Sequence, residues 1–284
     1  MRKRALIQAN TAVLLFGLAG LFARWIRLPA ICITFGRVFF SSITLGIWLR
    51  VREKGIPRPE RRDILAMVGA GAVLALHWWS FLQSIQLSTV AIGTITFSSF
   101  PLFLTFLEPL FFHERLTLRN VLTALVILAG VIITVPEFSL ENSMVLGIAV
   151  GMVSALTYAV LTLLNRYFAG KYSGTVISFY EQASAAVILL PFVLKAGVKP
   201  TPTDLGLLLF LGVVTTAAAH TLFISSLKDI PARLAGVISS LETVYGILFA
   251  WLLLGEVPRL REIIGGTVII AAVAMENIKS EISG

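Results

Sequence analysis

Residues 84–131 read SIQLSTVAIGTITFSSFPLFLTFLEPLFFHERLTLRNVLTALVILAGV, and residues 226–273 read SLKDIPARLAGVISSLETVYGILFAWLLLGEVPRLREIIGGTVIIAAV. The two blocks lie 142 residues apart and share 10 of 48 positions. The match is weak in so apolar a composition, but it aligns Glu114 with Glu256. It also aligns Arg119 with Arg261, and charged residues are rare in this chain. The pattern indicates an internal repeat, with residues 1–142 as the first copy and 143–284 as the second.

The composition excludes an ordinary soluble domain. Of the 284 residues 57% are hydrophobic and only 13% are charged, and the mean hydropathy is +0.91, whereas soluble domains carry about 25% charged residues. The single cysteine, Cys32, has no partner for a disulfide or a cysteine metal site. The net charge of +8 comes from basic residues placed between apolar runs. This distribution favours membrane orientation over nucleic-acid binding.

Hydropathy predicts ten membrane-spanning helices, each of about 20 mostly apolar residues. They cover residues 6–23, 30–49, 64–85, 89–112, 120–136, 144–165, 173–194, 204–226, 232–254 and 260–278. The connections are short, and no soluble domain separates the spans. We therefore expect an all-α integral membrane protein in which each half contributes five helices. Because five is odd, the second copy enters the membrane from the opposite side, and the halves are predicted to be inverted repeats.

Lys and Arg in the connections predict the orientation, because they concentrate on the cytoplasmic side. If the N-terminus is inside, the cytoplasmic connections receive 16 of the 23 basic residues. The outer connections receive six, namely Arg24, Arg27, Lys195, Lys199, Arg259 and Arg261. The bias predicts an even number of spans, both termini in the cytoplasm, and a multi-pass protein of the cell inner membrane.

Polar side chains recur at helical spacing in six spans. Spacings of three and four place them on one helical face, and polar groups in lipid face one another or a water-filled cavity. The stripes are His77, Ser80, Phe81 and Ser84; Thr94, Phe97, Ser98 and Pro101; Ser154, Thr157, Tyr158 and Asn165; Ser178, Glu181 and Gln182; Thr216 and His220; and Ser239, Glu242 and Thr243. They predict a central cavity with aromatic walls. The alternative for each Ser or Thr is a bond to a backbone carbonyl or a helix contact.

Three charged side chains, Arg37, Glu181 and Glu242, lie in the middle of the second, seventh and ninth predicted spans. A buried charge needs a partner or water. Arg37 therefore either pairs with one of the glutamates or clamps a substrate carboxylate through its planar fork. We predict Arg37 and Glu181 as structural or coupling charges. His77 and His220, one position apart in the aligned halves, fit either a proton shuttle or a buried hydrogen bond.

The stretch from Gly93 to Pro101 in the fourth span is rich in small residues. It ends in a proline, which removes one helical hydrogen bond. The aligned stretch of the ninth span, residues 235–243, is also rich in small residues. Both fit a hinge or a binding backbone. Small residues also permit close helix packing, which is the alternative interpretation.

The stretch Leu107-Glu-Pro-Leu-Phe-Phe-His-Glu-Arg-Leu-Thr117 resembles the end of the fourth helix in the EamA family of the drug/metabolite transporter superfamily. The stretch from Ser240 to Glu256 resembles the matching place in that family's second repeat, with Thr243 where proline is usual. Arg37 matches an arginine often seen in the family's second helix. The resemblance covers the whole chain. It implies alternating access around a central cavity and export of small metabolites, aromatic amino acids among them.

The stripes and the resemblance together predict an exporter of a small metabolite, with an aromatic or hydrophobic amino acid as the expected substrate. The predicted substrate-binding residues are His77, Trp78, Phe81, Thr94, Phe97, Ser98, Thr157, Tyr158, His220, Ser239, Glu242 and Tyr245. The aromatic members offer stacking surface, and Thr94, Ser98, Thr157 and His77 offer hydrogen bonds. The alternative is a proton-coupled multidrug or other metabolite exporter, in which Glu181 or Glu242 titrates.

The sequence contains no P-loop, zinc-binding His-Glu-x-x-His or nucleophile elbow. We therefore expect no enzyme activity, no cofactor and no metal site. The expected partners are a small-molecule substrate and the lipid bilayer, without nucleic acid, and the expected state is a monomer or weak homodimer. An intramembrane enzyme or a non-transporting scaffold is a further alternative, which a liposome flux assay distinguishes from a transporter.

Overall fold

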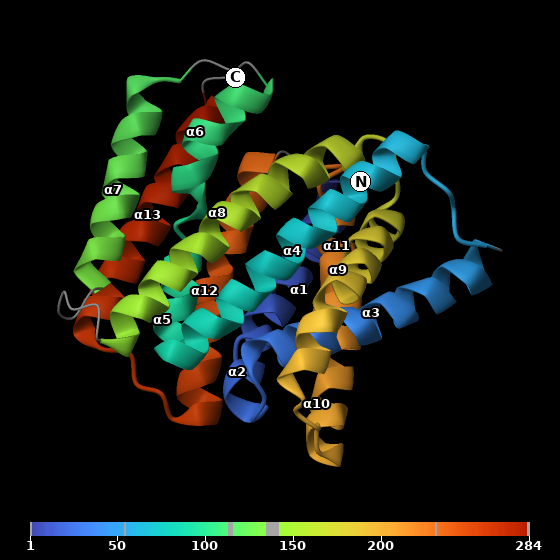
Figure 1. Cartoon of the computed structure of the whole chain (residues 1–284). Helices are drawn as coiled ribbons and strands as arrows, with labels where there is room; N and C mark the ends of the chain where they lie inside the picture. Colours follow the sequence, from blue (N-terminus) through green and yellow to red (C-terminus); the bar gives the residue numbers. More distant parts are fainter. Residues whose placement is uncertain (1, 54, 113–115, 135–141, 231, 283–284) are drawn as a thin grey trace.

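The structure is a computed structural model that describes residues 2–53, 55–112, 116–134, 142–230 and 232–282. These residues form helices and no strands, gathered in one bundle (Figure 1). The first half contains α1 (Arg2–Ala19) with α2 (Phe22–Trp25), α3 (Ala30–Arg52), α4 (Arg61–Leu87), α5 (Val90–Phe97) with α6 (Phe100–Phe112), and α7 (Leu118–Thr134). The second half contains α8 (Ser143–Ala169), α9 (Gly174–Ala196), α10 (Pro202–Gly212) with the π-helical turn η1 (Val213–Ala218) and α11 (Ala219–Ser226), α12 (Ala232–Leu254), and α13 (Leu260–Ile282).

The helices have the length and composition of membrane spans. Seven segments of the described chain are long and apolar enough to cross a bilayer: Lys3–Trp25, Ala30–Arg52, Arg61–Leu87, Val90–Phe111, Ser143–Ala169, Gly174–Ala196 and Pro202–Ser226. Two shorter apolar helices, Asn120–Thr134 and Ile238–Leu254, lie in α7 and α12, and α13 completes the bundle. Large apolar side chains such as Trp48, Leu65, Val187 and Trp251 are exposed on its outside, where lipid would cover them. The prediction of an all-α membrane protein is confirmed.

Helices of the two halves pack against each other. α4 packs along α8 and α9, α3 along α9 and α10, α1 along α11 and α12, and both α5 and α6 along α8. α7 and α13 run side by side at one edge of the bundle (Figure 1). A Cβ atom on Gly151 of α8 would lie 2.9 Å from the Oγ atom of Ser84, so only glycine allows α4 and α8 to approach this closely.

Two spans depart from regular α-helix. The fourth is broken between α5 and α6 at Ser98 and Ser99, within the stretch that the sequence marks as weakened. Pro101 has no N–H to donate to the preceding turn, and the Ser99 hydroxyl donates to the carbonyl of Thr96 at 2.6 Å. The aligned stretch of α12 is unbroken. The predicted similarity of the two stretches therefore does not extend to a helix break.

The eighth span contains η1, where Thr215 and Thr216 both donate their hydroxyls to the carbonyl of Leu211, at 2.9 and 2.7 Å. The preceding Gly212 lies against α3, and a Cβ there would lie 3.0 Å from the carbonyl oxygen of Arg37. This contact brings Arg37 and Thr216 together. π-Helical turns occur frequently at functional sites.

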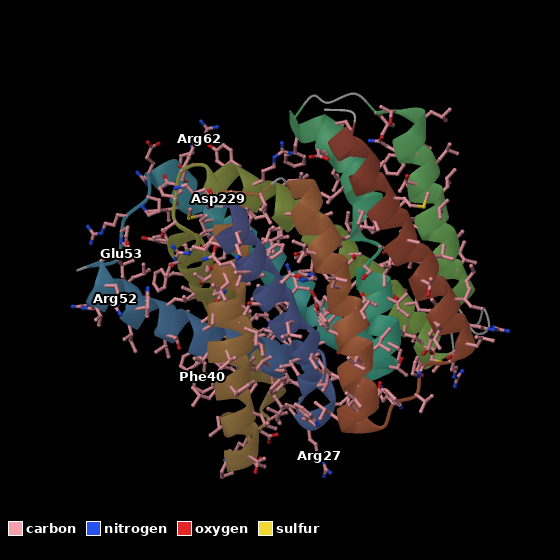
Figure 2. The ribbon with its side chains drawn as sticks, turned by 180° about the vertical axis from the view of Figure 1, so that it is seen from behind. Arg27, Phe40, Arg52, Glu53, Arg62 and Asp229 are labelled. Carbon is pink, nitrogen blue, oxygen red and sulfur yellow. The ribbon has the colours of Figure 1, made fainter. Side chains whose placement is uncertain are left out.

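Both ends of the chain lie at the same end of the bundle. α1 begins and α13 ends at the upper end in Figure 1. Figure 2 shows Arg62 and Asp229 at this end and Arg27 at the opposite end. This arrangement is the one expected for an even number of membrane crossings.

Candidate functional site

The buried polar side chains at the centre of the bundle form one connected group, the central cluster. It draws on six of the spans. Its members are Arg37 from α3, His77 and Trp78 from α4, Tyr158 from α8, Glu181 from α9, Thr216 and His220 from η1 and α11, and Ser239 and Glu242 from α12. All are buried except Tyr158, which is partly buried. Several ionisable groups buried together in an intramembrane interior indicate a functional site.

Arg37 is the cation of the central cluster and is only 2% exposed. Its Nε atom donates to the Thr216 hydroxyl at 3.1 Å, and its guanidinium carbon lies 3.8 Å from the centre of the Trp78 ring. The described residues offer no carboxylate within 4.0 Å of Arg37, although Glu242 lies within electrostatic range. The guanidinium thus lies over the indole ring of Trp78, and neither glutamate is paired to it.

Glu242 also lacks a close partner. It is 8% exposed and makes no hydrogen bond to another described residue. It lies within electrostatic range of Arg37 and of the Tyr158 hydroxyl, which faces Ser239. The central cluster therefore holds two opposite charges, from α3 and α12, that are near each other without forming an ion pair.

Glu181 is fully buried and pairs with histidine rather than arginine. One of its oxygens, Oε2, lies 3.2 Å from Nε2 of His220. The His220 ring stands edge-on to Trp78 with their centres 5.6 Å apart. Asn165 of α8 also interacts with the Glu181 carboxylate. Glu181 therefore interacts with His220 and Asn165, whereas Glu242 lies near Arg37.

His77 lies in an aromatic wall. Its Nδ1 atom is 3.0 Å from both the hydroxyl and the carbonyl oxygen of Ser154. Its ring centre is 5.0 Å from that of Tyr158, 5.5 Å from Phe97 and 6.5 Å from Phe81. Three predicted substrate-binding residues, Phe81, Phe97 and Tyr158, thus lie against the His77 ring. Two more, Trp78 and His220, contact each other, and Trp78 follows His77 in the chain.

Other predicted binding residues use their polar atoms within the protein. The hydroxyls of Thr94 and Thr157 donate to carbonyls of their own helices, at 2.9 Å to Val90 and 2.7 Å to Val153. The Ser98 hydroxyl bonds to Thr243 of α12, which itself donates to the carbonyl of Thr94 at 3.0 Å. These bonds join α5 to α12, as in the helix-contact alternative. Their role in substrate binding stays a prediction.

The contacts of Tyr245 are with Phe249 and α1 rather than with members of the central cluster. Its ring stacks with Phe249 at 6.4 Å, and a Cβ on Gly17 of α1 would be 2.6 Å from the Tyr245 Cβ. Sequence reasoning placed Thr216 on a stripe with His220 but did not include it among the site residues. Its signal was that spacing of four, because Thr216 and His220 face the same region as Arg37 and Glu181.

Ion pairs join the helices at both ends of the bundle. At one end Arg24 Nε lies 3.0 Å from Glu256 Oε1, and the Val90 N–H donates to Glu256 Oε2 at 3.0 Å. Arg24 also donates to the carbonyl of Ser88. The matching acid of the first half, Glu114, lies outside the described residues, and so does the Arg119 side chain.

At the other end, Arg166 Nη1 lies 2.6 Å from Glu108 Oε1, joining α8 to α6. The Tyr172 hydroxyl donates to Asp63 Oδ2 at 2.7 Å, and Lys171 Nζ lies 3.3 Å from the same oxygen. The bond to Asp63 raises the pKa of Tyr172, and the bond to Tyr167 raises the pKa of Lys171. Ion pairs and hydrogen bonds thus connect the helices at both ends of the bundle.

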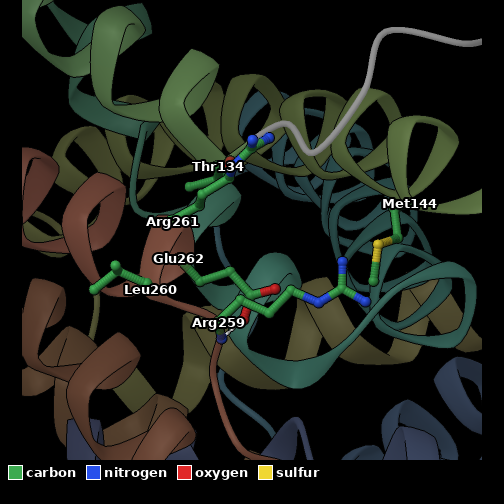
Figure 3. A pocket seen from close by; sticks show the side chains of 6 residues that line it. All are labelled: Thr134, Met144, Arg259, Leu260, Arg261 and Glu262. Carbon is green, nitrogen blue, oxygen red and sulfur yellow. Dashed lines mark hydrogen bonds between the residues drawn. The ribbon is translucent and has the colours of Figure 1, made fainter.

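A cavity of about 300 Å³ lies where α13 begins, at the same end as Glu256. Figure 3 shows its lining, which is Thr134, Met144, Arg259, Leu260, Arg261 and Glu262. The Arg259 side chain extends across it toward Met144 (Figure 3). None of the predicted substrate-binding residues lines this cavity, so it is separate from the central cluster.

Three relatives resemble the chain over most of its length. It is 27% identical to an uncharacterized transporter of Archaeoglobus fulgidus over 92% of both chains. It is 28% identical to the pseudopaline exporter CntI of Pseudomonas aeruginosa, over 85% of this chain and 86% of the exporter. It is 25% identical to the S-adenosylmethionine uptake transporter of Rickettsia bellii, over 87% of this chain and 83% of that transporter.

A solved crystal structure of another protein aligns with a TM-score of 0.68 and 19% identity, over 99% of each chain, so the two share a fold. The sequence profile of the EamA-like transporter family matches this chain twice, at residues 3–135 and 145–277. The two matched segments begin 142 residues apart, which is the offset of the repeat predicted from the sequence. Together they cover nearly the whole chain, so the protein belongs to the EamA-like transporter family and is a membrane transporter rather than an enzyme.

Proposed function

We propose that this transporter exports amino acids with aromatic or hydrophobic side chains, and that Arg37 and Glu242 bind the two charges of the zwitterion. The single observation that carries the proposal is the separation of these two residues. They are buried in one cluster, within electrostatic range, yet more than 4.0 Å apart. An isolated pair of buried opposite charges gains by direct contact. A ligand with a carboxylate and an ammonium group satisfies both charges without bringing them together.

The aromatic wall supports an aromatic or hydrophobic side chain on the substrate. Tyr158 lies 4.9 Å from both Phe97 and Phe100, edge to face. Together with His77 these rings border the side of the cluster that carries Glu242 and Ser239. Aromatic rings bind other rings in such offset and edge arrangements. S-Adenosylmethionine, which one relative takes up, also carries the charged groups of an amino acid.

We further propose that transport proceeds by alternating access between two inverted five-helix repeats, residues 1–142 and 143–284. The double match to the family profile supports two copies. Helix packing supports them too. In chain order α1–α2 corresponds to α8, α4 to α10–η1–α11, and α5–α6 to α12. α4 packs on α8 as α11 packs on α1, and α6 packs on α8 as α12 packs on α1. Each of these helices thus packs on the other half as its counterpart does, which is expected of two equivalent halves.

The proposed orientation places both termini in the cytoplasm, in the cell inner membrane. The excess of Lys and Arg in connections on the side of the N-terminus supports it. In this orientation the Arg24–Glu256 pair lies on the outer side. Cysteines introduced at Lys3 and Lys199 test the topology, because only the second should react with a membrane-impermeant thiol reagent in intact cells.

Counterflow in proteoliposomes tests the substrate. We expect exchange of labelled phenylalanine against unlabelled phenylalanine, and much weaker exchange against phenethylamine or phenylpropionate, each of which lacks one charge. Equal exchange of the amine and the amino acid would overturn the role of Arg37. Absence of exchange with every amino acid would overturn the substrate class.

A further inference from the structure

We propose that Glu181 and His220 form a proton-binding site that couples export to proton entry, separate from the charges that bind the substrate. The inference rests on the proposed export function and names the ion that drives it. Its geometric basis is the contact of 3.2 Å between Glu181 Oε2 and His220 Nε2. Glu181 is fully buried and His220 is 6% exposed. An acid and an imidazole in contact inside a membrane can hold and release one proton between them.

Several buried polar atoms on this pair and on residues near it in sequence or in space have no hydrogen-bond partner among the residues that the structure describes. They are Glu181 Oε1, Ser178 Oγ, Asn165 Oδ1 and Thr221 Oγ1. Ser178 lies one turn from Glu181 on the same face of α9, Thr221 follows His220, and Asn165 interacts with the Glu181 carboxylate. Unpaired polar atoms in an apolar interior are costly and therefore rare. Their concentration here fits a site that takes up a proton with its water.

No Lys or Arg among the described residues lies within 4.0 Å of the Glu181 carboxylate, because the charged groups on the neighbouring helices have other partners or lie farther away. The neighbours are Arg37 on α3, bonded to Thr216; His77 on α4, bonded to Ser154; Asp63 at the end of α4, bonded to Tyr172; Arg166 on α8, paired with Glu108; and Glu242 on α12, near Arg37. Gln182, beside Glu181, bonds to Ser41 of α3. Within the described part of the chain, His220 is thus the one group in contact with Glu181 that can become a cation. A proton neutralises the buried carboxylate where no fixed cation does.

The proton step involves one O–H or N–H bond and no other covalent change. A proton entering from outside binds the Glu181 carboxylate or the His220 imidazole, and the same bond breaks when the site opens to the cytoplasm. A zwitterion leaving the cell carries no net charge. Exchange for one proton therefore moves one positive charge inward per cycle, so a potential that is negative inside also drives it.

The first test uses proteoliposomes loaded with labelled phenylalanine, measured with and without an imposed proton gradient. We expect the gradient to speed wild-type efflux several-fold. Glu181→Gln, which imitates the protonated acid, should keep full counterflow and lose the response to the gradient. Glu181→Asp should restore part of it. Glu262→Gln, a buried carboxylate at the start of α13, is the matched control and should respond as wild type does.

The proposal is overturned if Glu181→Gln still responds to the gradient, or if the wild type shows counterflow without any response. A protein with no counterflow at all refutes the proposed function instead. A second test then decides the inference, because it needs no substrate.

The second test measures tryptophan emission of the purified protein against pH. Trp78 contacts the His220 ring, and a protonated imidazole quenches indole, so the difference between wild type and Trp78→Phe reports protonation of His220. We expect Glu181→Gln to change the pH dependence of the emission and His220→Gln to remove it. Identical curves for wild type and Glu181→Gln would overturn the proposal.

Discussion

Two pairs of opposite charges each take one member from residues 1–142 and one from residues 143–284, and the pairs differ in contact and in burial. Arg24 and Glu256 are in contact at 3.0 Å, their side chains are 31% and 24% exposed, and backbone groups complete their bonds. Arg37 and Glu242 are buried and remain more than 4.0 Å apart. A closed pair with backbone partners holds helices together. An open pair in the interior leaves both charges available to a ligand.

The largest expected effect is that of Arg37→Gln. It removes the charge that the proposed substrate carboxylate needs, and charge-assisted hydrogen bonds contribute about 1.5–3 kcal/mol each. We expect transport to fall about 100-fold or more in a counterflow assay. Arg37→Lys keeps the charge without the planar fork and should retain an intermediate rate. Arg50→Gln, at the exposed end of the same helix, is the control. Wild-type transport by Arg37→Gln would remove Arg37 from the site.

Glu242→Gln should have the next largest effect, and it should change selectivity. Loss of the carboxylate weakens binding of the substrate ammonium, so we expect about a tenfold rise in KM for phenylalanine. Inhibition by phenylpropionate, which has no ammonium group, should change little. Competition assays with both compounds measure the difference. An equal loss for both would indicate a structural role for Glu242.

The closed pair should tolerate change better than the open one. Arg24→Gln or Glu256→Gln removes a partly exposed ion pair, whose contribution to stability is about 1 kcal/mol or less. We expect a small fall in thermal stability and a change of two- to threefold in transport rate. The combined exchange Arg24→Glu with Glu256→Arg should recover part of the loss. A loss as large as that of Arg37→Gln would contradict the comparison.

The smallest effect is expected at the exposed end of α8, where Lys171 contacts Tyr167 and Asp63. The raised pKa of Lys171 means that its contribution to stability is present at neutral pH. That contribution disappears only as alkaline pH removes the proton. Lys171→Gln should therefore match wild type in transport, with a small difference in Tm that vanishes at high pH. A Tm difference that grows with pH would contradict this account.

The spans could be predicted from the sequence because the bilayer imposes a length and a composition on each of them. Arg37, Glu181 and Glu242 could be identified because charges inside spans are rare. Their partners could not be predicted. Arg37 donates a hydrogen bond to Thr216 and lies over the Trp78 ring, and it does not pair with a glutamate. The rotation of α3 against the eighth span decides which side chains meet, and the sequence does not reveal that rotation. Thr94 and Thr157 have the spacing of site residues, yet their hydroxyls bond to their own helices.

Under the proposed repeat, the π-helical turn η1 gives His77 and His220 corresponding places although they do not align in sequence. At an offset of 142 residues His77 aligns with Ala219, one position before His220. A π-helical turn holds one residue more than an α-helical turn. Every residue after it therefore takes the angular place that its predecessor would occupy in an uninterrupted helix. His220 thus occupies the angular position that corresponds to His77, and the backbone corrects a difference of one residue in the sequence. Deleting one residue within η1 should therefore restore the α-helical turn and keep the imidazole facing Glu181, whereas a regular α-helix of unchanged length would rotate the imidazole by about 100° away from it.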